Sequence, residues 1–265
     1  MINEIPNRLI DFDIFIEKPI YIFEKKNFFE IKDYNELRNN FPKEQIFPGF
    51  HDKGEKIFLN NKHEEFYKFI ENNIWGKFYN FLNRKEFIIL LIDLISPQIK
   101  KIENRKNFKK YYYNNKFSNT LFNKVKKKLL KIANYENIRL GFEFSIIKKN
   151  CYIPPHCDTE NKLLSLMIYF PPEEKLAQKN DIHDYGTNFY NKKDGAKENL
   201  DIWESKYLDK NNSHIFFENY EVFYKSKFEE NKLVGFIKND KSWHDVSIFE
   251  KNILRKSLNI NLYIE

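Results

Sequence analysis

The ten residues from Arg255 to Ile264 alternate between two kinds of side chain. One set is polar and the other is aliphatic: Arg255, Ser257, Asn259 and Asn261 alternate with Leu258, Ile260, Leu262 and Ile264. A period of two is typical of a β-strand, because successive side chains point to opposite faces of a sheet. We therefore predict a strand here, with one face in the hydrophobic core and the other forming the polar wall of a pocket.

Strand patterns run through the whole second half of the chain. Phe142, Phe144 and Ile146 alternate with polar residues, and residues 163–170 are apolar enough for a strand covered on both faces. Before about residue 135 the patterns are mainly helical, after a short pair of strands. A chain of 265 residues fits one domain of this kind. We predict an α+β fold in a single domain, residues 1–265, with helical support in 1–135 and a β core in 136–265.

Four helices are expected in the supporting half. Asp33 and Glu36 have the spacing of a capping box, which predicts a helix that begins at Asp33 and ends before Pro42. Apolar residues near helical spacing predict three more helices, over His63–Leu82, Glu86–Ile95 and Ser118–Ala133. We expect each of them to pack one face against the sheet.

Charge and cysteine content narrow the class of protein. The net charge of +7 comes from 45 basic and 38 acidic residues that are scattered along the chain, so we expect a solvated surface and no nucleic-acid partner. Two cysteines do not make a disulfide framework, which favours a reducing compartment. The N-terminus has no secretion-signal pattern, and the longest apolar run, Phe87–Ile95, contains Asp93 and is too short to cross a bilayer. We therefore expect a cytoplasmic protein without a membrane partner.

A possible metal site lies in the β half. His156 and Asp158 form a His-x-Asp pair, His244 follows much later, and Arg255 is the only Arg after the pair. Two His nitrogens and one carboxylate on one side of Fe(II) leave open positions for other ligands, and the planar guanidinium of Arg binds a carboxylate bidentately. On an extended strand Cys157 would point away from its two neighbours. The helix and cysteine motifs typical of zinc sites do not occur.

With these residues the chain resembles the Fe(II)/2-oxoglutarate-dependent dioxygenases, closest to their prolyl-hydroxylase-like branch. That family has a double-stranded β-helix core, also described as jelly-roll or cupin-like. The segments that resemble its first strand, first helix and consecutive core strands are 18–23, 35–37, 40–42, 142–158, 162–170, 186–190, 233–236 and 243–246. One departure is that Ile146 and Ile147 stand near the place where many prolyl hydroxylases carry a Tyr that contacts 2-oxoglutarate.

The resemblance implies roles for the matching positions. His156, Asp158 and His244 would bind Fe(II), and Arg255, helped by Ser257, would bind the distal carboxylate of 2-oxoglutarate. Such enzymes use O2 and 2-oxoglutarate to hydroxylate a substrate carbon, and they release succinate and CO2. Retention of Asp158 argues against halogenation, because related halogenases leave that position free for a halide.

The substrate stays open at this stage. A peptide, a free amino acid, a sugar or another small molecule all fit the resemblance, and the oligomeric state is not predicted. Two other classes fit the sequence as well: a non-catalytic jelly-roll binding module that keeps the fold, with or without the metal, and a cupin-like metal protein that uses another acid.

Two polar stretches, residues 171–185 and 191–213, are candidates for the rim around the site. Within them Trp203, Tyr207 and His183 are our candidates for lining a substrate entrance. His51 and His63 have no His or carboxylate at convincing ligand spacing, so we expect surface or capping roles for both.

Overall fold

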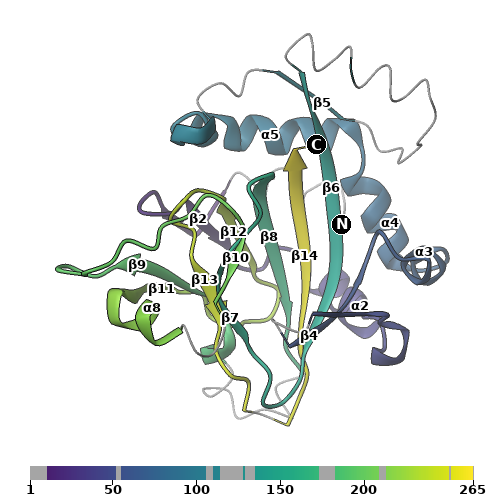
Figure 1. Ribbon diagram of the computed structural model, residues 1–265. Coiled ribbons are helices and arrows are strands. Elements are labelled where there is room, and N and C mark those ends of the chain that lie inside the picture. Colours follow the sequence, from purple (N-terminus) through teal and green to yellow (C-terminus); the bar gives the residue numbers. More distant parts are fainter. Residues whose placement is uncertain are drawn as a thin grey trace.

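The computed structural model describes residues 11–51, 55–105, 110–113, 128, 135–172, 183–208, 213–250 and 252–264. Two β-sheets face each other, and most of the helices lie on the outer side of the larger sheet (Figure 1). The predicted α+β class with a double-stranded β-helix core and supporting helices is confirmed.

The larger sheet contains nine strands. Its order is β1 (Ile14–Ile16), β2 (Ile22–Lys25), β12 (Leu233–Ile237), β8 (Lys162–Phe170), β14 (Arg255–Ile264), β6 (Tyr135–Ile147), β4 (Lys56–Asn60) and β3 (Gly49–His51). Neighbours along this order are antiparallel, whereas β5 (Lys110–Tyr113) pairs with β6 in parallel. The C-terminal strand β14 therefore lies at the centre of the sheet (Figure 1).

The smaller sheet contains five antiparallel strands. Their order is β10 (Lys206–Tyr207), β7 (Ile153–Cys157), β13 (His244–Val246), β9 (Asn188–Lys192) and β11 (Tyr220–Lys225). Helix α8 (Ser213–Asn219) packs on the outer face of this sheet, where Phe216 contacts the rings of Tyr190 and Trp243. The inner face of the sheet looks across a cavity to β6, β8 and β14.

The supporting half forms a helical layer. It consists of α2 (Ile31–Asn39), α3 (Glu64–Ile70), α4 (Ile74–Leu82) and α5 (Lys85–Ile99), and the shorter 3-10 turns are η2 (Glu44–Ile46), η3 (Glu103–Arg105) and, later in the chain, η5 (His183–Tyr185). Within the described part of the chain, no helix has both the length and the hydrophobicity that a membrane span requires.

Alternation on the strands divides the large sheet into an apolar face and a polar face. On β6, Phe142 and Phe144 point toward the helices, and Trp75 of α4 meets the Phe144 ring edge-on at 4.8 Å between centroids. Glu143 and Ser145 point the other way and line the cavity. Large aromatic contacts of this kind bury much apolar surface. They fix the sheet from behind and leave its polar face free for a site.

Some predicted boundaries were wrong. Helix α2 begins at Ile31 after Glu30, which makes no side-chain cap, so Asp33 lies in the first turn and is not the cap. The predicted helix over His63–Leu82 is two helices, because Asn73 caps a new one by accepting a hydrogen bond from the backbone N–H of Trp75 at 2.8 Å. The predicted helix over Ser118–Ala133 lies outside the described residues, except for Lys128.

Candidate metal and cosubstrate site

The three predicted metal ligands lie together on the inner face of the small sheet. His156 near the end of β7 and His244 at the start of β13 are direct cross-strand partners, so their side chains share one face. Asp158 follows His156 by two residues. One donor atom from each of the three residues can be chosen so that all lie within 4.8 Å of one another. The pairing of β7 with β13 thus brings together two His residues that are almost ninety positions apart in the sequence.

Both imidazole rings are held by backbone carbonyls. Nδ1 of His156 lies 2.9 Å from the carbonyl oxygen of Pro154, and Nδ1 of His244 lies 2.9 Å from that of Ser242. A carbonyl oxygen can only accept, so each Nδ1 carries the proton and each Nε2 keeps its lone pair. Hydrogen bonds to the remote nitrogen are the usual way in which proteins orient metal-binding imidazoles.

Burial sets the charge state of the three donors. It lowers the pKa of both His156 and His244 below the ordinary value, well below it for His156. Burial alone would raise the pKa of Asp158, but Lys162 and the two imidazoles hold it well below its usual range. At neutral pH the group therefore contains two neutral imidazoles and one carboxylate, the forms that bind a divalent cation.

Lys162 is a member of this site that the sequence analysis missed. Its Nζ donates to Oδ1 of Asp158 at 2.7 Å, while Oδ2 of Asp158 lies 3.9 Å from Nε2 of His244. Ser165 Oγ lies 3.3 Å from the same Oδ2. The Lys162 ammonium thus binds one carboxylate oxygen of Asp158, and the other oxygen faces the imidazoles. Its only signal in the sequence is a lysine at the start of an apolar strand, four residues after Asp158.

Arg255 lies deeper in the same cavity. It is 2 % exposed, its Nε donates to the carbonyl oxygen of Tyr185 at 2.7 Å, and its guanidinium lies 5.3 Å from the ring centroids of Tyr169 and Phe228. Among the described residues no carboxylate forms an ion pair with it, and burial lowers its pKa. A buried cation without a counter-ion is costly, and a bound anion would relieve that cost.

The polar wall predicted for β14 is present. Arg255, Ser257, Asn259 and Asn261 line the cavity, whereas Leu258, Ile260 and Leu262 pack into the core behind the sheet. Ser257 lies directly opposite Tyr169 of β8, whose hydroxyl is 2.9 Å from Thr187 Oγ1. These hydroxyl groups surround the end of the cavity that holds Arg255.

The cavity joins the two groups. Its volume is about 400 Å³, and its lining includes His156, Asp158 and His244. The lining also runs along β14 from Arg255 and Ser257 to Asn261, which contacts Ser165 beside Asp158. Small-molecule sites commonly enclose roughly 300–1,000 Å³. One compartment can therefore hold a metal ion and a small organic anion side by side.

Of the three entrance candidates, only Tyr207 lies at the cavity. Its ring stacks on His156 at 4.4 Å between centroids with an interplanar angle of 8°, and His51 lies on it at 4.9 Å. Trp203 instead packs near the helical core, under the Lys238 ammonium at 4.8 Å. His183 faces Glu229 at 4.0 Å, away from the cavity. The surface role expected for His51 was wrong, because the β3–β4 pairing places it in the cavity wall.

A second charged group lies in the cavity across from the metal ligands. Lys56 Nζ donates to Oε1 of Glu143 at 2.9 Å, and Asn259 Nδ2 donates to the same oxygen at 3.2 Å. Burial opposes ionisation of Glu143, but Lys56 and, more weakly, Lys162 lower its pKa below the ordinary value. Neither Lys56 nor Glu143 was predicted to have a function from the sequence, since 87 residues separate them.

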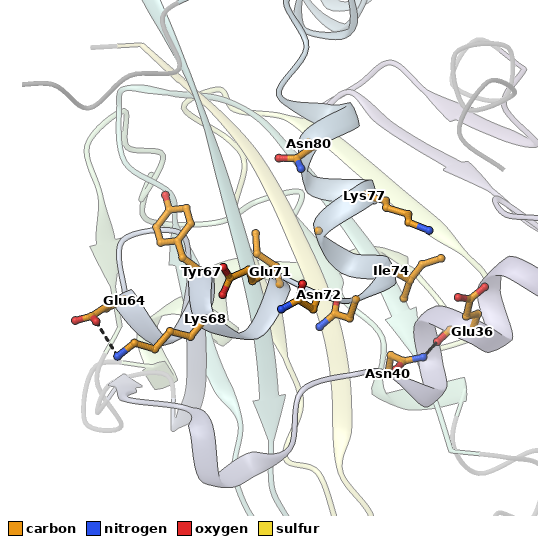
Figure 2. A pocket seen from close by; sticks show the side chains of 13 residues that line it. Glu36, Asn40, Glu64, Tyr67, Lys68, Glu71, Asn72, Ile74, Lys77 and Asn80 are labelled. Atoms are coloured by element: carbon orange, nitrogen blue, oxygen red, sulfur yellow. Dashed lines mark hydrogen bonds and ion pairs between the residues drawn. The ribbon is translucent and has the colours of Figure 1, made fainter.

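A different hollow lies on the helical side, between α2, α3 and α4. Figure 2 shows its amide, carboxylate and lysine side chains, including the Glu64–Lys68 ion pair at 2.7 Å. Both members of that pair are highly exposed, and the lining contains no His, Cys or Arg. This hollow is therefore a solvated surface without the His and Cys ligands that zinc or redox-active metals prefer.

No protein-family model and no curated protein matches the sequence. Among solved structures, the chain is similar to a Pseudomonas putida prolyl-4-hydroxylase, with 9 % identity, 99 % of this chain and 100 % of that one covered, and a TM-score of 0.44. A viral collagen prolyl hydroxylase from Paramecium Bursaria Chlorella virus-1 has 13 % identity, coverage of 96 % and 94 %, and a TM-score of 0.40. HygX from Streptomyces hygroscopicus, solved with nickel, 2-oxoglutarate and hygromycin B, has 8 % identity, coverage of 91 % and 82 %, and a TM-score of 0.41. These likenesses are loose, and the chemistry depends on the residues of the site.

Proposed function

We propose that this chain is an Fe(II)- and 2-oxoglutarate-dependent dioxygenase of the prolyl-hydroxylase-like kind, acting as a single domain. It hydroxylates an unactivated carbon of a peptide, amino acid, sugar or other small substrate and releases succinate and CO2. One observation carries the proposal: a His-Asp-His group and a buried Arg without a carboxylate partner share one cavity of about 400 Å³.

His156, Asp158 and His244 would hold the iron. Two imidazoles and one carboxylate also occur in zinc hydrolases, so the donor set alone does not choose the metal. The choice of iron rests on Arg255. A hydrolytic zinc site has no need of a buried guanidinium at the far end of the same cavity, whereas a dicarboxylate cosubstrate needs an anchor for its distal carboxylate.

Arg255 and Ser257 would bind that distal carboxylate. The Nε of Arg255 is already used by Tyr185, which fixes the plane of the guanidinium. Thr187 lines the cavity, and its hydroxyl lies 2.9 Å from that of Tyr169, whose ring contacts the Arg255 guanidinium. These two hydroxyl groups are candidates for the further contact that the sequence did not identify. Bound in this way, iron, 2-oxoglutarate and O2 would supply the oxidising chemistry, in which one oxygen atom would enter the substrate and the other would enter succinate.

The remaining residues position the reacting groups. Lys162 and Ser165 hold the carboxylate of Asp158, and the carbonyl oxygens of Pro154 and Ser242 hold the two rings. The ring of Tyr207 covers one face of His156 and limits access of water to it. Preorganised ligands of this kind lower the reorganisation that the reaction requires.

The test is anaerobic titration of the purified protein with Fe(II) and then 2-oxoglutarate, followed by measurement of succinate after O2 is admitted. We expect a visible charge-transfer absorption that requires both additions, and succinate formation that requires O2. Asp158→Ala should abolish the absorption, while Asp184→Ala, which removes an exposed carboxylate paired with Lys225, should not.

Two outcomes would contradict the proposal. Metal binding without 2-oxoglutarate binding would favour the cupin-like alternative with another acid. Binding of both without any succinate, over a broad substrate panel, would favour a non-catalytic binding module.

A further inference from the structure

Apart from Arg255 and the metal ligands, the cavity is lined by further charged groups and amides. It contains the ammonium groups of Lys56 and Lys162, the carboxylate of Glu143, and the side-chain amides of Asn60, Asn259 and Asn261. Buried charge is costly unless it is compensated. These residues therefore favour ligands whose charged groups pair with them.

Glu143 is at the centre of a polar row. It lies directly opposite Asn60 on β4 and Asn259 on β14, and all three residues line the cavity. Its neighbours on β6, Phe142 and Phe144, belong to the apolar core on the other face. Both hydrogen bonds to its carboxylate from Lys56 and Asn259 go to Oε1. The row forms a wall that can receive a cationic group.

Lys162 provides a positive charge in the same cavity, opposite in sign to the carboxylate of Glu143. In the protein alone its charge is balanced by Asp158 at 2.7 Å. With a divalent ion shared by Asp158, and with 2-oxoglutarate bound between that ion and Arg255, the charges of ion, Asp158, cosubstrate and Arg255 sum to zero. The Lys56–Glu143 pair is also neutral. Lys162 then shares Asp158 with the ion, and its ammonium group has further N–H donors beyond the one that Asp158 accepts, so a carboxylate group on the substrate can pair with it locally.

We infer, on the basis of the proposed function, that the substrate is a small zwitterion of the amino-acid class, with its ammonium group at Glu143 and its carboxylate at Lys162. A neutral sugar offers no cationic group to Glu143 and no anionic group to Lys162. An internal residue of a peptide has neither an α-ammonium nor an α-carboxylate group. A peptide would also meet the rings of His51 on β3 and Tyr207 on β10, which lie 4.9 Å apart in the cavity wall and connect the edges of the two sheets.

The test uses the full chain loaded anaerobically with Fe(II) and 2-oxoglutarate. The ligands are the free L-amino acids, each compared with its N-acetyl derivative and its methyl ester. Binding is measured by calorimetry and by the change in the visible absorption, and succinate release is measured after O2 is admitted. We expect at least one free amino acid to bind and to stimulate succinate release, and either modification to weaken binding at least tenfold. The ester tests Lys162 without disturbing its bond to Asp158.

Glu143→Gln tests the ammonium end. We expect it to weaken binding of the free amino acid at least tenfold and to narrow the difference between that ligand and its N-acetyl derivative, while 2-oxoglutarate still binds. Glu64→Gln is the matched control, because it removes an exposed carboxylate that is also paired with a lysine, and it should change nothing. If the loaded protein binds no free amino acid, or binds the modified ligands equally well, the inference is overturned and the proposed function stands. If 2-oxoglutarate itself does not bind, the proposed function fails and the inference fails with it.

Discussion

Replacement of Arg255 by Met separates a ligand-binding role from a structural role. Met keeps an apolar contact with the rings of Tyr169 and Phe228, between which the guanidinium now lies at 5.3 Å from each. It removes the charge and the hydrogen bond from Nε to Tyr185. The residue is 2 % exposed and forms no ion pair with any carboxylate in the described parts of the chain. Without ligands, the protein should therefore lose little stability when the charge of Arg255 is removed.

The expected magnitudes differ for stability and for binding. Losing one hydrogen bond and two cation–π contacts costs about 1–3 kcal/mol, but removing the desolvation cost of an uncompensated cation offsets much of it. We expect the free energy of unfolding to change by about 1 kcal/mol or less. Losing charge-assisted hydrogen bonds to a carboxylate should cost about 2–4 kcal/mol of binding free energy, which is roughly a 30- to 800-fold weaker Kd for 2-oxoglutarate.

The assays are anaerobic calorimetry of 2-oxoglutarate binding to the metal-loaded protein, and urea unfolding of the metal-free protein. Lys256→Met is the matched control, since Lys256 is the next residue on β14 and its ammonium lies over the Phe41 ring outside the cavity. This control should leave the Kd within about twofold. A drop of roughly 3 kcal/mol or more in stability, with an unchanged Kd, would refute the ligand-binding role.

Three further predictions follow from the described contacts. Asp158→Ala should weaken binding of Fe(II) or Zn(II) at least about 100-fold by calorimetry, because it removes the only anionic donor of the three and leaves Lys162 without its carboxylate partner. Asp184→Ala, at an exposed position, should leave metal binding unchanged. Trp75→Ala should lower the free energy of unfolding by about 3–5 kcal/mol in urea, because the ring is fully buried against Phe144, whereas Phe217→Ala, 45 % exposed, should cost less than about 1 kcal/mol. Glu143 has a pKa below its ordinary value of 4.5, so its ionised form stabilises the fold above pH 4.5, and this stabilisation is lost as the pH falls through the lowered pKa. The difference in Tm between wild type and Glu143→Gln should therefore be larger at pH 7 than at pH 3.5. A Tm difference that does not depend on pH would contradict the assignment.

Local patterns in the sequence were sufficient to predict the strands that carry the site. The alternation from Arg255 to Ile264 and the spacing of His156 and Asp158 depend only on the period of a strand. His244 required knowledge of pairing, and the resemblance to a family supplied its place in the strand order. The register of His244 opposite His156 is the physical reason why the two imidazoles meet.

Contacts across distant strands could not be predicted in this way. The hydrogen bond from Lys56 to Glu143 and the contact between the rings of His51 and Tyr207 depend on the order of the strands in the two sheets. A single sequence does not encode that order in any local period. The break between α3 and α4, by contrast, had a local signal in Asn73, a residue type favoured as a helix cap.

The backbone that carries the three donors is held together without them. Strands β7 and β13 pair through their main chains, and their outer face is fastened by Cys157, Trp243 and Phe216. A zinc finger unfolds when its ion is removed, whereas the proposed ion here would not be needed to hold the fold together. A chelator is accordingly expected to remove the metal while leaving the far-ultraviolet circular dichroism spectrum unchanged, and lost iron would then be replaceable without refolding the protein.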